Sequence, residues 1–171
     1  GEKIKVGVGL ADFNNNGLDD IVFGTDSGNL YLIYDSLENA PGYPVYLNDK
    51  IQSAPSIVSH GEQKYIFVGS KDDNLYSIDS NGNIRFSFQT DGNIYSSPSF
   101  NDTNHGLMVF FSSSDGNIYN IDINGNLYQG WPRNIGGEAI GSIVFADLDN
   151  NGQDEIISSV NSEIIILNQD G

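Results

Sequence analysis

The stretch GSKDDNLYSIDSNGN (residues 69–83) returns with few changes as SSSDGNIYNIDINGN (residues 112–126). Weaker copies lie at residues 24–35 and 158–171. One position aligns in all four copies and is held by Tyr31, Tyr76, Tyr119 and Ile165, at spacings of 45, 43 and 46 residues. Self-similarity at a fixed period is the signature of a repeat architecture, so this fourfold repeat decides the fold.

Each copy contains two short apolar runs before the aligned position. The later runs are at 21–23, 65–68, 107–111 and 155–157, and the earlier ones at 6–10, 54–58, 97–100 and 140–145. They are rich in β-branched and aromatic residues, as β-strands are. Asp-Gly, Asn-Gly and Ser-Gly pairs between the runs supply the positive φ of tight hairpin turns. No window keeps a helical period, so each copy is predicted to be four antiparallel strands.

Four-stranded antiparallel units of about 40–50 residues are typical of propeller blades. We therefore predict an all-β fold, with residues 1–171 forming one β-propeller region. The expected blades are at about 3–50, 51–92, 93–137 and 138–171. A β-sandwich of unrelated hairpins is the alternative, and four aligned units argue against it.

The fourth unit is predicted to lack its outer strand. Strands are expected at 140–146, 154–160 and 162–168, but nothing follows them that matches residues 126–131 of the third unit. Residues 163–167 would then form an open apolar sheet edge, which natural proteins avoid. Either the chain is part of a longer propeller of about seven or eight blades, or a second copy completes the ring. The chain begins at Gly1 and its single methionine is Met108, so we expect a processed or excised piece.

Composition excludes several classes of function. The 7 basic and 23 acidic side chains give a net charge of −16, which repels the phosphates of nucleic acids. No apolar run approaches the roughly 20 residues of a membrane span, so direct membrane insertion is not expected. The chain has no cysteine, which excludes disulfides and thiolate metal sites.

Two acidic loops join the first and second strands of units 1 and 4. They read DFNNNGLDD (12–20) and DLDNNGQDE (147–155), with oxygen-bearing side chains at positions 1, 3, 5 and 9 and glycine at position 6. Calcium takes six to eight oxygen ligands, which alternating residues of a tightly curled loop can supply. The candidate ligands are Asp12, Asn14, Asn16 and Asp20 in the first loop and Asp147, Asp149, Asn151 and Glu155 in the second, with the backbone carbonyls of Leu18 and Gln153.

These loops are not EF-hands. An EF-hand has a glutamate at position 12 and flanking helices, whereas this position is Phe23 or Ser158 and the flanks are strands. A metal-free Asx-rich turn is the remaining alternative. The second loop offers three carboxylates and the first offers two, so we predict tighter calcium binding at the second. The middle units have lost the loop, and His60 and His105 there are interpreted as solvent-facing turn residues.

The acidic loops, each followed by an apolar strand, resemble the FG-GAP repeats (also called VCBS-type repeats) of integrin α-chain and bacterial surface propellers. The strings DDNLYSID (72–79) and SSPSF (96–100) are similar to PQQ-like propeller repeats of quinoprotein dehydrogenases and outer-membrane assembly propellers. The segment Gly130-Trp131-Pro132 resembles an outer-strand signature of secreted proteins that mix both types. The FG-GAP resemblance implies calcium at the eight side chains named above, and it specifies no biochemical activity.

The expected function is a non-catalytic, calcium-stabilised binding or adhesion module of an extracellular or cell-surface protein. Its ligand would be a protein or glycan on the loop face, and weak calcium sites are filled where calcium is about millimolar, outside cells. A rigid structural spacer and a fragment of a propeller polysaccharide lyase or hydrolase are the alternatives. A quinoprotein is not expected, because Trp131 is the only tryptophan and there is no cysteine pair.

Overall fold

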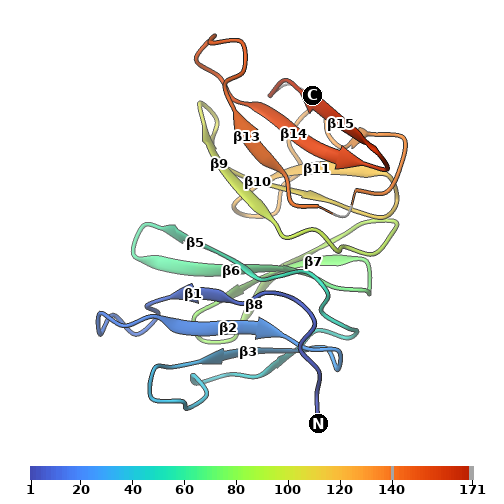
Figure 1. Ribbon diagram of the computed structural model, residues 1–171. Helices are drawn as coiled ribbons and strands as arrows, with labels where there is room; N and C mark the ends of the chain where they lie inside the picture. The colour runs from blue at the N-terminus through green and yellow to red at the C-terminus, as the bar shows by residue number, and fades with distance from the viewer. Residues whose placement is uncertain (140, 170–171) are drawn as a thin grey trace.

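The computed structural model describes residues 1–139 and 141–169, and this part of the chain contains β-strands and no helix. The strands form four antiparallel sheets, which we call blades 1 to 4 (Figure 1). Blade 1 holds β1 (Gly9–Ala11), β2 (Asp20–Gly24), β3 (Asn29–Ile33) and β4 (Val45–Tyr46), and blade 2 holds β5 (Ser56–His60), β6 (Gln63–Gly69), β7 (Asn74–Asp79) and β8 (Ile84–Gln89). Blade 3 holds β9 (Ser99–Thr103), β10 (Gly106–Ser112), β11 (Asn117–Asp122) and β12 (Arg133–Asn134), and blade 4 holds β13 (Val144–Ala146), β14 (Glu155–Val160) and β15 (Glu163–Leu167).

Strand order within each blade follows the chain, and the register repeats from blade to blade. The aligned position of the repeat pairs with the second strand at Phe23, Val68, Phe111 and Ser158 in turn. The predicted four-stranded antiparallel units are therefore confirmed, and blade 4 has three strands within the described residues.

The first strand of every blade begins later than predicted. The apolar run at 54–58, for example, becomes a strand only from Ser56. The residues before it bind two different blades: the Ile51 N–H donates to the Thr25 carbonyl of blade 1, and the Lys71 N–H donates to the Lys50 carbonyl, each at 3.0 Å. Lys50 and Ile51 therefore link blade 1 to blade 2 and lie outside the ladder of β5 with β6, which begins at Ser56.

The outer strand of blade 3 was also predicted wrongly. It is β12 at Arg133–Asn134, and the segment 126–131 contributes only an isolated bridge from Leu127 to Ile121, followed by a turn at residues 129–130. Gly130 has a φ of +88°, and the Trp131–Pro132 peptide bond is cis. Because proline has no N–H to donate to a ladder, pairing resumes only after Pro132.

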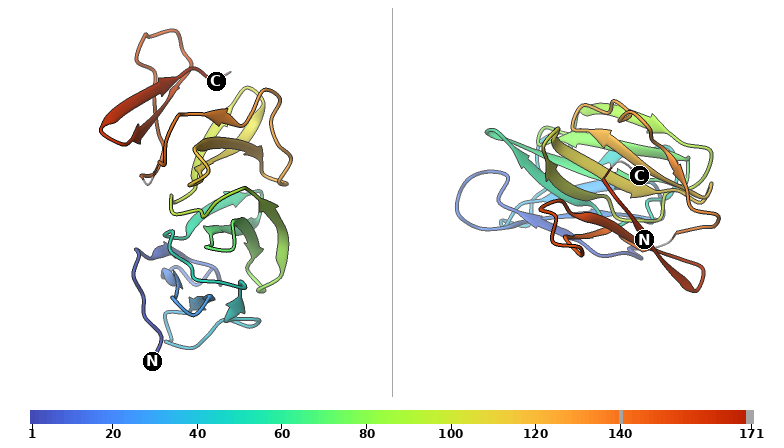
Figure 2. Two further views of the ribbon diagram at one scale, coloured as in Figure 1. Left: turned by 90° about the vertical axis from the view of Figure 1, so that its right-hand side faces the viewer. Right: turned by 90° about the horizontal axis from the view of Figure 1, so that it is seen from above.

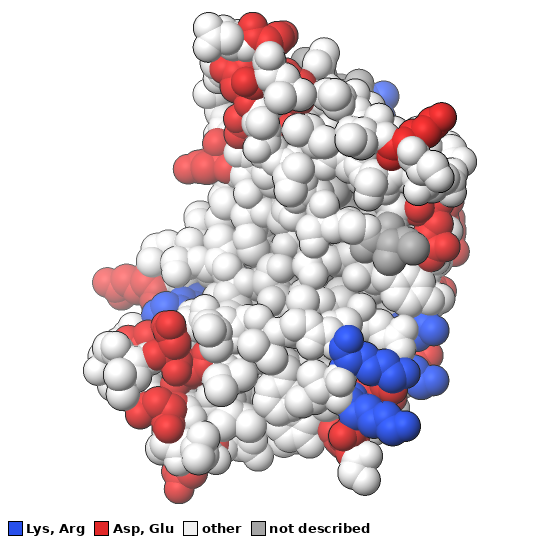
Figure 3. All heavy atoms as spheres, viewed as in Figure 1, with Lys and Arg blue, Asp and Glu red and all other residues white. Residues whose placement is uncertain are grey.

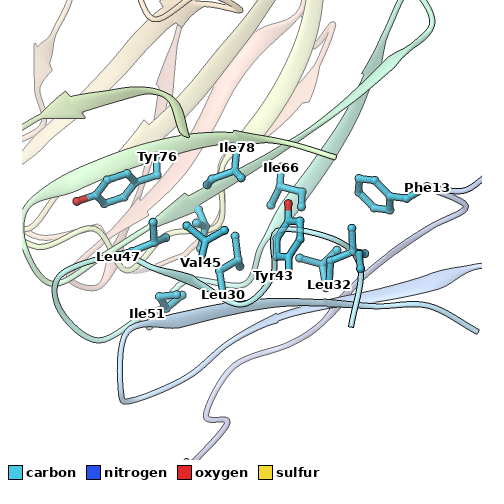
Figure 4. Close-up of a cluster of buried hydrophobic side chains, with 13 residues drawn as sticks. Phe13, Leu30, Leu32, Tyr43, Val45, Leu47, Ile51, Ile66, Tyr76 and Ile78 are labelled. Carbon is cyan, nitrogen blue, oxygen red and sulfur yellow. The ribbon is translucent and has the colours of Figure 1, made fainter. Parts of the chain in front are cut away.

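The hydrophobic core lies between blades, in one cluster for each neighbouring pair. Between blades 1 and 2, Leu30 and Leu32 on β3 lie across from Ile66 and Ile78 (Figure 4). Alternate residues of a strand point to opposite faces of its sheet, so each inner blade contributes to two clusters. A fully buried leucine or isoleucine stabilises the fold by about 1.5–3 kcal/mol.

Two glycines set how closely successive blades approach. A Cβ atom on Gly69 would lie 2.7 Å from Ile94 Cβ and 2.8 Å from the Ile94 carbonyl oxygen. Gly24 faces Ile51 in the same way. At the third contact Ser112 takes the place of glycine, its hydroxyl donates to the Ala139 carbonyl at 2.9 Å, and alanine replaces the isoleucine.

Polar contacts also join neighbouring blades. The Tyr43 hydroxyl donates to the Asp79 carbonyl at 2.7 Å, and burial raises the pKa of this phenol. The Arg85 guanidinium donates to the Ile123 carbonyl at 3.1 Å and stacks on the Tyr65 ring at 3.6 Å. Because hydrogen bonds are directional, these contacts constrain how neighbouring blades are oriented across an otherwise apolar interface.

The tight turns after β7 and β11 are held by one carboxylate each. In the second of them, Asp122 accepts the backbone N–H groups of Asn124 and Asn126 and the Asn126 side-chain amide. Partial burial raises the pKa of Asp122, but the hydrogen bonds from Asn126 and its neighbours outweigh burial and leave the pKa below 3.8. Asp79 is held low in the same way by Asn83 and Asn81.

We expect this turn to make stability depend on pH in the acid range. A depressed folded-state pKa contributes stability that is complete above the unfolded value of about 3.9 and is lost as pH falls through the folded pKa. Asp122→Asn should therefore melt below the wild type at about pH 6, with the gap closing towards about pH 2.5. Melting temperatures across this range check it, and a gap that stays constant with pH would contradict it.

Candidate metal centre

The two acidic loops lie on the same side of the arc of blades. In Figure 1 the β1–β2 connection projects to the left and the β13–β14 connection rises at the upper left. Figure 3 shows Asp and Glu side chains gathered at both places, whereas Lys and Arg gather towards the lower right. The loops have equivalent positions in their blades, because each joins the first strand to the second.

The loop at 147–155 is curled around its first carboxylate. Asp147 Oδ1 accepts the Asn151 N–H at 3.0 Å, and its Oδ2 accepts the Gly152 N–H at 2.9 Å. Gly152 has a φ of +86°, a conformation that glycine adopts without strain. At the end of the loop the buried Glu155 accepts the Leu148 N–H at 2.7 Å.

Three carboxylates converge in this loop. Oxygens of Asp147, Asp149 and Glu155 all lie within 4.8 Å of one another. Within residues 1–139 and 141–169 no other group of three acidic or histidine side chains is drawn together in this way. The structure therefore brings together three of the four predicted side-chain ligands of the second loop.

The loop at 12–20 repeats the same bonds with fewer acids. Asp12 accepts the N–H groups of Asn16 and Gly17 at 3.1 and 2.8 Å, and the hydrogen bond from Gly17 lowers its pKa. Asp20 is fully buried and accepts the Phe13 N–H at 2.8 Å, as Glu155 accepts that of Leu148. Asn14 stands where the second loop has Asp149, so the two loops share a shape and differ in charge.

The fifth-position asparagines hold the loops together through backbone contacts. Asn16 Oδ1 accepts the Leu18 N–H, and Asn151 Oδ1 accepts the Gln153 N–H, each at 2.8 Å. Each oxygen keeps a second lone pair, so both remain candidate ligands.

Sequence reasoning missed Asp35, which lies beside the first loop. Its carboxylate accepts the Asn16 side-chain amide at 2.8 Å, and its N–H donates to Asp20 Oδ1 at 3.1 Å. It follows the aligned tyrosine by four residues, and Gln169 has the same place after Ile165. That shared spacing was the signal that could have found it.

A polar hollow of about 230 Å³ lies next to the second loop. Asp102 and Asn104 of blade 3 line one side, and Asp147, Asp154 and Gln169 line the other. The hollow therefore places oxygen and amide groups of blade 3 beside the carboxylates of blade 4. His105, in the same hairpin as Asn104, lies against the Tyr128 ring with centroids 5.2 Å apart.

No known protein family matches the chain by sequence, and no curated protein matches it. The described residues contain no helix long and apolar enough to cross a lipid bilayer.

Solved structures match the fold. BBS1N in complex with ARL6DN is similar with a TM-score of 0.71 and 11% identity, over 98% of this chain and 52% of that chain. BamB from Moraxella catarrhalis is similar with a TM-score of 0.68 and 21% identity, over 96% of this chain and 46% of that one. The fold is a β-propeller.

The chain thus spans about half the length of these two propeller proteins. The computationally designed protein Ika4 is matched over 91% of its own length, with a TM-score of 0.68 and 16% identity over 97% of this chain. The predicted fold class of four blades agrees with this likeness, and the last blade has three strands within the described residues.

Proposed function

We propose that this propeller region is a non-catalytic binding module of an extracellular or cell-surface protein, stabilised by calcium at loops of the FG-GAP (VCBS) type. One observation carries the proposal: Asp147, Asp149 and Glu155 bring carboxylate oxygens within 4.8 Å of one another in a loop whose backbone is repeated at residues 12–20.

The donor chemistry of the loops fits calcium. Every side chain proposed as a ligand offers a hard oxygen, which is the donor that calcium prefers. Bound calcium would supply positive charge that relieves repulsion among the three carboxylates of the second loop. Glu155 is the second-strand ligand and Asp147 immediately follows β13, so the ion would tie these strands together at one end of blade 4.

The loop face is the proposed ligand surface. The hollow beside the second loop presents carboxylates and amides, including Asp102, Asp154 and Gln169, and such groups bind a protein or glycan through hydrogen bonds or through the ion. The crystallised complex of BBS1N with ARL6DN supports a protein as the ligand of this fold. An extracellular location follows from the calcium concentration that weak loop sites need.

Calcium is expected to raise the melting temperature by about 5–10 °C. A ligand at 100 times its Kd stabilises the folded state by about 2.7 kcal/mol, and each kcal/mol shifts the melting temperature by about 2–4 °C at this size. Thermal melts with calcium, magnesium and EDTA check this. Glu155→Gln is the control, since an amide oxygen still accepts the Leu148 N–H while the charge is removed; it should melt like the wild type in EDTA and respond less to calcium. Equal melting temperatures in calcium and EDTA would overturn the calcium part of the proposal.

A glycan array probed in calcium, followed by incubation of the protein with the polysaccharides that bind, distinguishes a binding module from an enzyme fragment and from a spacer. Binding that EDTA abolishes, without turnover, supports the binding module. Turnover of a polysaccharide would favour the lyase or hydrolase fragment, and a calcium-stabilised protein that binds neither glycan nor protein would favour the spacer.

A further inference from the structure

Blade 4 exposes an apolar face that every other blade buries. We call Val144, Ile157, Ile164 and Ile166 the C-face; Ile164 is 73% exposed, Val144 55% and Ile166 54%. The register aligns Ile157 and Ile164 with six residues of the other blades that are at most 1% exposed, namely Val22, Phe67, Phe110, Leu30, Leu75 and Ile118. In each of those blades the next blade covers this face.

Blade 1 exposes the other side of such a blade-to-blade contact, namely the face that a preceding blade would cover. We call Leu10, Ile21, Phe23 and Tyr31 the N-face; Leu10 is 57% exposed and Ile21 37%. The residues aligned with Ile21 in the other blades are fully buried against the preceding blade, namely Ile66, Val109 and Ile156. The N-face therefore corresponds to the apolar face that the preceding blade covers in blades 2, 3 and 4.

One copy of the chain does not bring these two faces together. Figures 1 and 2 place blade 1 at one end of the arc and blade 4 at the other. The three core clusters join only neighbouring blades. Exposed apolar faces of this kind mark interaction surfaces.

We propose that two copies of the chain associate head to tail, with the C-face of each packed on the N-face of the other, in a closed ring of eight blades. The contact continues the blade-to-blade packing that already occurs three times within the chain. Eight blades fall within the usual range of four to eight. Two copies also supply the length of one BBS1N or BamB chain, since one copy spans 52% and 46% of these. A head-to-tail interface closes into a ring when its rotation permits and otherwise forms filaments.

One pair of residues in this contact is mismatched in size. Ser159 has the position of Gly24 and Gly69, and Ile4 has the position of Ile51 and Ile94. Within the chain glycine faces isoleucine twice, and Ser112 faces Ala139. The contact between two copies would place Ser159 against Ile4, and this mismatch weakens the association of the two copies without abolishing it. Substitutions that restore either natural combination should therefore tighten association.

Light scattering coupled to size-exclusion chromatography, over a range of concentrations, tests the pairing. The wild type should reach twice the monomer mass of 18.6 kDa. Ile164→Glu on the C-face and Leu10→Glu on the N-face should each raise the dissociation constant more than about tenfold, by placing a charge in an apolar contact. Leu37→Glu is the matched control, because Leu37 is 82% exposed on a turn outside both faces and its change should leave association unaltered. Melting curves establish that all variants fold.

Mixing the two face variants distinguishes this arrangement from pairing of β15 edges. In a mixed pair, both substitutions fall in one of the two contacts and the other contact is of wild-type sequence, so mixed dimers should form more readily than dimers of either variant alone. Edge-to-edge pairing of β15 would leave Leu10→Glu dimeric, and this result would overturn the proposal.

Two further variants should strengthen association. Ile4→Ala reproduces the serine–alanine pair of blades 3 and 4, and Ser159→Gly reproduces the glycine–isoleucine pair of blades 1 and 2. Each should lower the dissociation constant severalfold. A wild type that stays monomeric at all concentrations, or a mass that grows without limit, would contradict the closed pair. The measurement is made in calcium and in EDTA, so its outcome is separate from that of the calcium proposal.

Discussion

Gly69→Ala is expected to lower the melting temperature by roughly 2–12 °C, from an overpacking cost of about 1–3 kcal/mol at about 2–4 °C per kcal/mol. The new methyl group would lie 2.7 Å from Ile94 Cβ and 2.8 Å from its carbonyl oxygen, and it would also meet Ile94 Cγ2. The backbone of blade 3 would have to move away for the methyl group to fit. Elsewhere glycine to alanine stabilises by about 0.4–1 kcal/mol through the unfolded chain, so the clash decides the sign.

Gly7→Ala is the matched control for this substitution. A Cβ there would lie 3.6 Å from Ala54 Cβ, which is ordinary van der Waals contact, and no strained φ is involved. Its melting temperature should equal or slightly exceed that of the wild type. Adding Ile94→Ala to Gly69→Ser builds the pair found at Ser112 and Ala139, and we expect the two changes together to cost less than the sum of their separate effects. Strict additivity of the two changes, or a Gly69→Ala protein as stable as the wild type, would show that the blades are not held at this spacing.

Calcium should bind the second acidic loop about tenfold or more tightly than the first, because affinity rises with the number of charged ligands. The second loop offers Asp147, Asp149 and Glu155, and the first has Asn14 in the place of Asp149. Titration calorimetry of Asp12→Ala should therefore retain the tighter site, and that of Asp147→Ala should retain only the weaker one.

The conservative variant Asp147→Asn separates charge from loop structure. Its side-chain oxygen still accepts a hydrogen bond from the loop, where Asp147 now receives the N–H groups of Asn151 and Gly152. The apo protein should melt near the wild type while calcium affinity falls as it does for alanine. Equal affinities of Asp12→Ala and Asp147→Ala would contradict the predicted order.

The blades could be predicted from the sequence because local patterns determine which residues pair within each sheet. In blades 2 and 3 the aligned tyrosines make the same contact: the hydroxyls of Tyr76 and Tyr119 donate to Asp72 and Asp115, four residues earlier. Alternating apolar residues and Asn-Gly turns then place the neighbouring strands. The second acidic loop was recognisable for the same reason, since its ligands lie within nine consecutive residues.

The features that the sequence did not reveal depend on contacts between distant residues. Asp35 ends the repeat copy at residues 24–35, but it comes beside the first loop only after β3 has paired with β2. Ile51, before the first strand of blade 2, donates to Thr25 of another blade. Arg85 likewise bonds the Ile123 carbonyl 38 residues away. Periodicity describes a single sheet, whereas these contacts arise from the packing of one sheet on the next.

The interblade packing also bears on how such a chain could have grown. Each core cluster needs only one blade and its successor, so duplicating a unit of 43 to 46 residues adds a sheet together with the interface that holds it. An inner copy then has two neighbours and diverges under the constraint of both, as the glycine–isoleucine and serine–alanine pairs illustrate. Within the described residues blades 1 and 4 each pack on one neighbour, and their outward faces keep the apolar pattern that the inner blades bury.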